Sequence, residues 1–284
     1  MDRSGRYGIL GALMTRLFCL ALVAFLPGAL YSLPAYAQES PRLTPISGTG
    51  DCNALVLEAV KEMPVAGDYK TSKQSFDGLR RAITLRGASL AIDPEAARPS
   101  FCSGATYLVF VRVLDQLSRQ GALTMDAQTL GALVVAGQVD GQGIWGRWNA
   151  NGPGTARLFS ELQLGQNFTD FAAARPGDFM KIFWTTEIGK KERGHSVVFL
   201  GTNKVGGQEF VRFWSSNMPT VAGDASGYGV KLVPRSKMAR VIFSRLEHPA
   251  NIAKAKTIAG TDAFLAGLLK RSAAMEEVRR MCGL

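Results

Sequence analysis

Apolar residues recur every three to four positions through most of the first half of the chain, which is the spacing of a helix with one buried face. The clearest example begins near residue 102, where Leu108, Val111 and Leu114 would share one face of a helix that runs to about residue 120. Pro99 and Ser100 supply a breaker and a possible cap before it. Similar spacing predicts helices over residues 51–63, 124–135 and 155–162, and residues 75–85 and 91–97 lean towards helix.

From residue 174 onwards the pattern becomes strand-like, with short apolar runs between turn residues. Tight turns such as Gly206-Gly207 separate the runs, which predicts neighbouring antiparallel strands. After Pro249 the chain returns to a helical pattern. The predicted strands cover residues 179–184, 194–201, 209–217, 228–233 and 240–246. Helices followed by an antiparallel sheet and further helices are typical of an α+β fold.

Residues 138–154 interrupt the helical pattern with glycine, asparagine and aspartate, which predicts a long loop. Trp145 and Trp148 lie within it. Two tryptophans in such a loop form either the wall or lid of a ligand cleft or a packing plug beneath the loop. Long loops often carry function, which favours the cleft.

The N-terminus has the pattern of a secretory signal. Three arginines precede an apolar run at residues 17–30, and Ala35 and Ala37 form a small-residue cleavage motif. We therefore expect a cleavable signal over residues 1–37, a linker over 38–50 and a single domain with helical extensions over 51–284. The mature protein would be secreted or periplasmic, with no stable membrane anchor; an uncleaved anchor is the alternative.

The chain is basic, with a formal net charge of +10. Such a balance suits an anionic cell-wall polymer, a membrane surface or a nucleic acid. No lysine and arginine block interleaved with aromatic residues and no zinc-finger spacing is present, so nucleic acid is not an expected partner. The two histidines are far apart and lack acidic neighbours at ligand spacing, so we expect no metal and no cofactor.

After signal cleavage three cysteines would remain, in a compartment where disulfides can persist. Cys52 and Cys282 lie near the two ends of the domain, and domain ends are often close in space. We therefore predict that these two form a disulfide and leave Cys102 as the free thiol.

Cys102 falls at the predicted start of a helix, where unpaired N–H groups and the helix dipole favour a thiolate. The alternative is a small buried hydrophobe. A cysteine nucleophile needs a base, and His195 opens a predicted strand, sharing a face with apolar residues. The base needs a third group to orient it, and Asn217 is preferred because its amide oxygen accepts an imidazole N–H without adding charge. Ser216 is the second choice; an ordinary turn is the alternative for both.

Three segments together resemble the NlpC/P60 and CHAP-like branch of the papain-like cysteine hydrolases. They are residues 101–109 around Cys102, the Pro176-Gly177-Asp178 turn that leads into a strand, and residues 194–201, which begin with Gly194-His195. The resemblance implies a papain-like fold in which the nucleophile helix packs on an antiparallel sheet. It also implies Cys102 as nucleophile, His195 as base and Asn217 or Ser216 as the third member.

Members of that family are mostly amidases and endopeptidases that act on peptidoglycan stem peptides, so the resemblance implies this activity and a peptidoglycan or peptide substrate. We expect substrate contacts from Trp145, Trp148, Ser103 and Ser216. Two alternatives stay open: a non-catalytic module that binds cell-wall peptide or glycan, and acyl transfer of the transglutaminase type.

Overall fold

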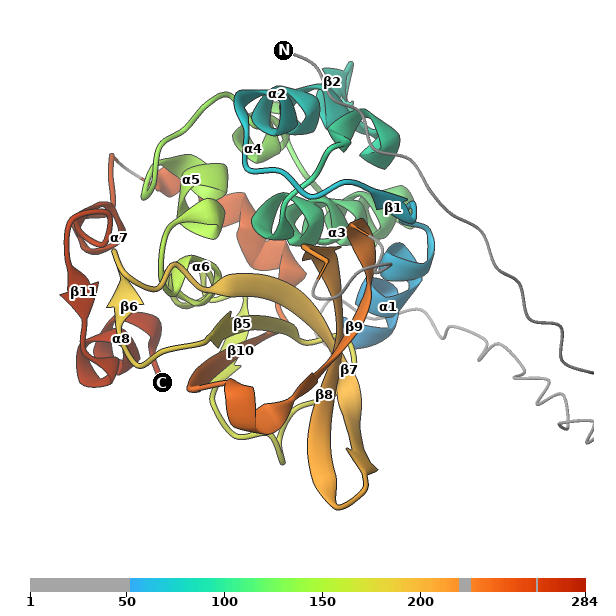
Figure 1. The fold of residues 1–284 in the computed structure, drawn as a ribbon. Helices are drawn as coiled ribbons and strands as arrows, with labels where there is room; N and C mark the ends of the chain where they lie inside the picture. Colours follow the sequence, from blue (N-terminus) through green and yellow to red (C-terminus); the bar gives the residue numbers. More distant parts are fainter. Residues whose placement is uncertain (1–51, 220–225, 259) are drawn as a thin grey trace, which may run out of the picture. The chain divides into compact units, whose positions relative to one another are not determined.

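The described part of the chain, residues 52–219, 226–258 and 260–284 of a computed structural model, is built around a seven-stranded antiparallel sheet (Figure 1). In spatial order its strands are β1 (Ala66–Gly67), β9 (Gly227–Pro234), β8 (Gln208–Asn217), β7 (His195–Val205), β5 (Phe179–Phe183), β10 (Arg240–Leu246) and β4 (Gly165–Phe168). All five predicted strands are present. The strands β7, β8 and β9 form the expected meander, but β10 returns to pair with the far side of β5.

Helices form the first half of the described chain, which confirms the α+β class. They are α1 (Asn53–Lys61), α2 (Lys73–Ala82), α3 (Cys102–Arg119), α4 (Ala127–Leu133), α5 (Gly143–Asn149) and α6 (Gly154–Leu162). The helix α3 packs against β7 and β8, and its predicted apolar face, Leu108, Val111 and Leu114, is fully buried. Its position across the end of the sheet is visible in Figure 1.

The C-terminal residues are largely helical, as predicted. They contain η3 (Pro249–Thr257), α7 (Ala263–Gly267) and α8 (Met275–Cys282), and a short pairing of β6 (Ile188–Gly189) with β11 (Ser272–Ala273). A short helix η2 (Arg235–Lys237) connects β9 to β10. None of the helices in the described ranges is long and apolar enough to cross a membrane.

The segment after α2 differs from the prediction. A hairpin of β2 (Ile83–Arg86) and β3 (Ser89–Ile92) replaces the expected helical continuation, and the single turn η1 (Pro94–Ala97) follows. Ile83, Thr84 and Ile92 are β-branched and favour strands. Gly87 adopts a positive φ of 60° in the two-residue turn, a conformation that glycine accepts readily.

Residues 138–154 are not a long loop, because α5 occupies their centre. Its glycines allow close packing: a Cβ atom on Gly146 would lie only 2.1 Å from the carbonyl oxygen of Val139. Trp148 is fully buried against Phe110 and Phe179. Its indole N–H donates to the carbonyl oxygen of Ser103 at 3.1 Å, so the predicted substrate contact for Trp148 is wrong and the packing alternative is right.

The predicted disulfide between Cys52 and Cys282 is not formed. Cys282 is a buried thiol on α8, in a cluster with Phe183 and Leu265, and burial raises its pKa to about 12. Cys52 is buried in the other large cluster, which surrounds α1 and α3. The two cysteines therefore belong to different clusters of the core.

The Pro-Gly-Asp turn that enters β5 is held by a buried ion pair. The carboxylate of Asp178 accepts from the guanidinium of Arg245 on β10 at 2.8 Å through both oxygens, and both side chains are buried. Asp178 also accepts from the side-chain amide of Asn53 at 2.8 Å. This turn therefore joins α1, β5 and β10.

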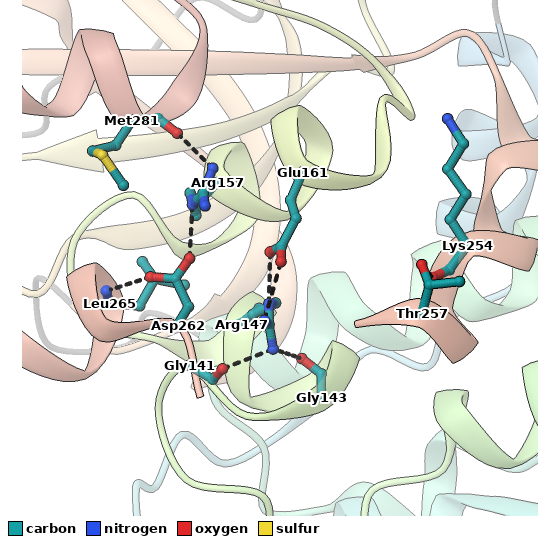
Figure 2. A network of polar contacts seen from close by, with 10 residues as sticks. All are labelled: Gly141, Gly143, Arg147, Arg157, Glu161, Lys254, Thr257, Asp262, Leu265 and Met281. Atoms are coloured by element: carbon teal, nitrogen blue, oxygen red, sulfur yellow. Dashed lines mark hydrogen bonds and ion pairs between the residues drawn. The ribbon is translucent and has the colours of Figure 1, made fainter. Parts of the chain in front are cut away.

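A second ion pair, formed by a buried arginine and a partly exposed glutamate, holds α5 (Figure 2). The Arg147 side chain is 1% exposed, and its guanidinium donates to both carboxylate oxygens of Glu161 on α6, at 2.7 and 3.1 Å. It also donates to the carbonyl oxygen of Gly141 at 2.7 Å. One turn earlier in α6, Arg157 pairs with Asp262 at 2.8 Å and donates to the carbonyl oxygen of Met281. Through these contacts α6 connects residues 141–147 to the C-terminal helices.

Replacing Arg147 by Met leaves Glu161 and the carbonyl oxygen of Gly141 without their buried donor. We expect the free energy of unfolding, measured by urea denaturation, to fall by about 3 kcal/mol. Arg271→Met is the matched control, because Arg271 makes the same two-pronged pair with Glu277 but is 46% exposed. Its loss should cost less than about 1 kcal/mol. Equal losses in the two variants would contradict the importance of the buried network.

Candidate active site

Cys102 is the first residue of α3, and hydrogen bonds of Ser100 fix the backbone just before this helix. The N–H of Ser100 donates to the carbonyl oxygen of Asp68 at 2.9 Å, and its carbonyl oxygen accepts from the N–H of Lys70 at 2.9 Å. The hydroxyl of Ser100 donates to the hydroxyl of Ser216 at 2.7 Å. Phe101, the residue before the helix, offers no side-chain cap, so the first N–H groups of α3 receive no side-chain acceptor from it.

His195 opens β7 and is paired with Ile182 of β5. On its other side β7 pairs with β8, and Val198 lies opposite Trp214 in this pairing. From Trp214, β8 continues to its last residue, Asn217. The Nε2 atom of His195 lies 3.1 Å from the Oδ1 atom of Asn217. The structure thus brings together the two residues that the sequence predicted as base and orienting group.

The amide of Asn217 has one orientation that satisfies its contacts. It is 3% exposed, and its Nδ2 donates to the carbonyl oxygens of Ser215 at 3.1 Å and Gly229 at 2.9 Å. Oδ1 is therefore the atom that faces the imidazole, and it accepts the Nε2–H of His195. Nδ1 is then the ring nitrogen left for the thiol.

The Cys102 thiol is hydrogen-bonded to His195, and the charges around the thiol favour its ionised form. Burial raises the pKa of the Cys102 thiol, but the charge and hydrogen bond of His195, the charge of Lys181 and the N–H of Ser196 outweigh it and lower the pKa to about 6. A thiol with this pKa is mostly ionised at neutral pH, as a cysteine nucleophile requires.

Tyr69 is a site residue that the sequence patterns did not indicate. Tyr69 forms an isolated parallel β-bridge with Ser100. This bridge brings the Tyr69 hydroxyl into hydrogen-bonding contact with Cys102. Burial raises the pKa of Tyr69, and the nearby Cys102 raises it further, so the hydroxyl stays protonated and acts as a donor. The contact joins positions more than 30 residues apart, which no local pattern reveals.

Lys181 is the second residue that the sequence patterns missed. It lies in β5, where every residue is buried, and its ammonium donates to the hydroxyl of Ser196 at 3.2 Å. A charged residue inside an otherwise apolar strand was the available signal, because such a lysine must either reach solvent or face a buried partner.

Three of the predicted substrate contacts are turned inwards instead. Ser103 is 5% exposed and donates to the Oδ1 atom of Asn149 at 2.6 Å. Ser216 is fully buried and accepts from Ser100, so it is neither a substrate contact nor the third member of the site. Trp145 is 1% exposed and packs on Tyr107 and Phe101. Ser103 and Ser216 are therefore internal links, and Trp145 is almost completely covered by its neighbours.

A hollow of about 450 Å³ is lined by residues of α2, of the segment 135–140 and of α5. Its lining includes Asn149, which holds Ser103, and Asp140, whose charge acts on Lys181. Its apolar lining consists of Phe76 of α2, Trp145 and Leu269 among others. Cys102, His195 and Asn217 are not among its lining residues, so the hollow is a separate concave surface connected to the site through Asn149 and Asp140.

No group of three histidine, cysteine or acidic side chains comes together as a metal site in the described ranges. Comparison with known proteins found no matching family model, no similar curated protein and no similar solved structure. The resemblance to the NlpC/P60 and CHAP-like hydrolases consequently stays a prediction from three sequence segments.

The site predicts selective thiol chemistry. At pH 7 brief treatment with iodoacetamide should label Cys102 and leave the buried Cys282, with its raised pKa, unlabelled, as measured by peptide mass spectrometry. Since the thiol takes up a proton as the pH falls through about 6, labelling should drop about tenfold for each unit below that value. His195→Ala removes the main opposing charge and should slow labelling at pH 7 at least about tenfold. Unchanged labelling in that variant would contradict the cysteine–histidine pairing.

Proposed function

We propose that this protein is a cysteine amidase or endopeptidase with Cys102 as nucleophile, His195 as acid and base and Asn217 as the orienting group. The observation that carries the proposal is the continuous contact from the thiol through the imidazole to the amide of Asn217. Each member has the property its role needs: a lowered thiol pKa, two engaged ring nitrogens and a fixed amide oxygen.

The reaction would proceed in two stages. The Cys102 thiolate attacks the amide carbonyl carbon, and a C–S bond forms. His195 gives its proton to the leaving nitrogen as the C–N bond breaks, which leaves a thioester. A water molecule then loses a proton to His195 and attacks the thioester, releasing a carboxylic acid and restoring the thiolate.

The negative oxygen formed during attack needs donors that are already in place. The backbone N–H of Cys102 is one, because it lies at the positive end of the 18-residue helix α3. The Tyr69 hydroxyl is the proposed second donor, since it already touches the sulfur and stays protonated. Two donors that are already in place are the general means of stabilising such an oxyanion.

We further propose a papain-like fold and peptidoglycan stem peptides as substrate. The packing of α3 on the antiparallel strands β7 and β8 supports the fold. The resemblance of the three sequence segments, the secretory pattern of the N-terminus and the basic charge support the substrate and a secreted or periplasmic location. The hollow lined by Asp140, Trp145 and Asn149 is the proposed surface for the peptide.

Incubation of the mature protein with peptidoglycan fragments, followed by mass spectrometry, tests the function. Cleavage of an amide bond is expected from the wild type and none from Cys102→Ala, with circular dichroism showing that the variant is folded. Equal cleavage by both proteins would refute the nucleophile. Binding without cleavage would favour the non-catalytic module, and transfer to an added amine in place of water would favour the acyl transferase.

A further inference from the structure

Lys181 points into the protein beside the proposed nucleophile and takes no part in the cysteine–histidine–asparagine contact. It is 4% exposed. Its side chain runs past Gly194, the residue before His195: a Cβ atom there would lie 2.7 Å from the Cε atom of Lys181. Gly194 has a φ of 77°. Because it has no side chain, the Lys181 side chain can occupy the space beside it.

The hydroxyl of Ser196 is the direct partner of the ammonium, at 3.2 Å. Across the described ranges, no carboxylate lies within ion-pair distance of it. The acidic groups that act on it from further away have other donors: Asp140 accepts from the N–H of Asn151 at 2.9 Å, and Glu192 accepts from the N–H groups of residues 184, 185 and 194.

A buried ammonium with a hydroxyl as its only close partner is costly unless an anion lies nearby. The remaining anion at this place is the Cys102 thiolate, whose sulfur accepts from the backbone N–H of Ser196, the same residue whose hydroxyl holds Lys181. Lysine and thiolate therefore flank one residue of β7.

We propose that Lys181 is a positioning residue whose ammonium, a second cation beside His195, keeps Cys102 in its thiolate form. The inference rests on the proposed function and explains how the thiolate survives next to an imidazole that repeatedly gives up its proton. The same charge would stabilise the thiolate when hydrolysis of the thioester expels it.

The electrostatics of the two groups agree with this geometry. Burial raises the pKa of Cys102, and Lys181 opposes it after His195. Burial lowers the pKa of Lys181, and Cys102 is the first of the groups that oppose it, ahead of Asp140 and Glu192. Each charge favours the other, as linkage requires.

The test is the pH dependence of Cys102 alkylation by iodoacetamide, followed by peptide mass spectrometry. For Lys181→Met we expect the midpoint to rise by about one pH unit, with the rate at high pH unchanged. Lys204→Met is the matched control, because it removes an exposed lysine near the other end of β7, and its midpoint should stay at that of the wild type. Lys181→Gln serves as a second neutral variant where Lys181→Met does not fold.

An unchanged midpoint in a folded neutral variant would overturn the role of Lys181. If the wild type still titrates near pH 6, the proposed function stands in that case. A wild-type midpoint near the ordinary thiol value of about 8.5 would instead overturn the proposed function itself.

Discussion

A negative sulfur inside a protein requires positive charge close to it, and the arrangement around the start of α3 follows from this requirement. Burial opposes ionisation of Cys102, whereas His195 and Lys181 favour it from the neighbouring strands β7 and β5. Burial in turn disfavours the charge of Lys181, and Cys102 is the first group that opposes this. The thiolate therefore depends on the start of α3 and on both strands together. The antiparallel pairing of β5 with β7 places Lys181 and His195 near the same thiol.

Polar side chains around Cys102 and His195 hold these groups in place. Ser100 joins the start of α3 to β8 through Ser216, and Ser103 joins it to α5 through Asn149. The Arg147 network then holds α5 and the preceding residues against α6. Polar side chains near the nucleophile thus act as internal links, which limits the movement of the thiol relative to the imidazole and suits a site that depends on short contacts.

Much of this site could be predicted because its members lie at ends of elements. Cys102 at a helix start, His195 at a strand start and Asn217 at a strand end each follow from a local pattern. Tyr69 and Lys181 could not be found that way, because their roles arise from pairing between distant segments. The prediction of a long loop was wrong because glycines at positions such as Gly146 permit close packing of a helix. The prediction of the disulfide was wrong because proximity of the domain ends does not decide which core cluster each cysteine joins.

The central claim is that the folded protein holds one thiolate, on Cys102, at neutral pH. The ultraviolet absorbance of the thiolate, measured against pH as the difference between the wild type and Cys102→Ser, tests this without any substrate. We expect a difference of one thiolate per chain at pH 7 that disappears with a midpoint near 6. No difference at pH 7, with thiolate appearing only near the ordinary cysteine value of about 8.5, would contradict it.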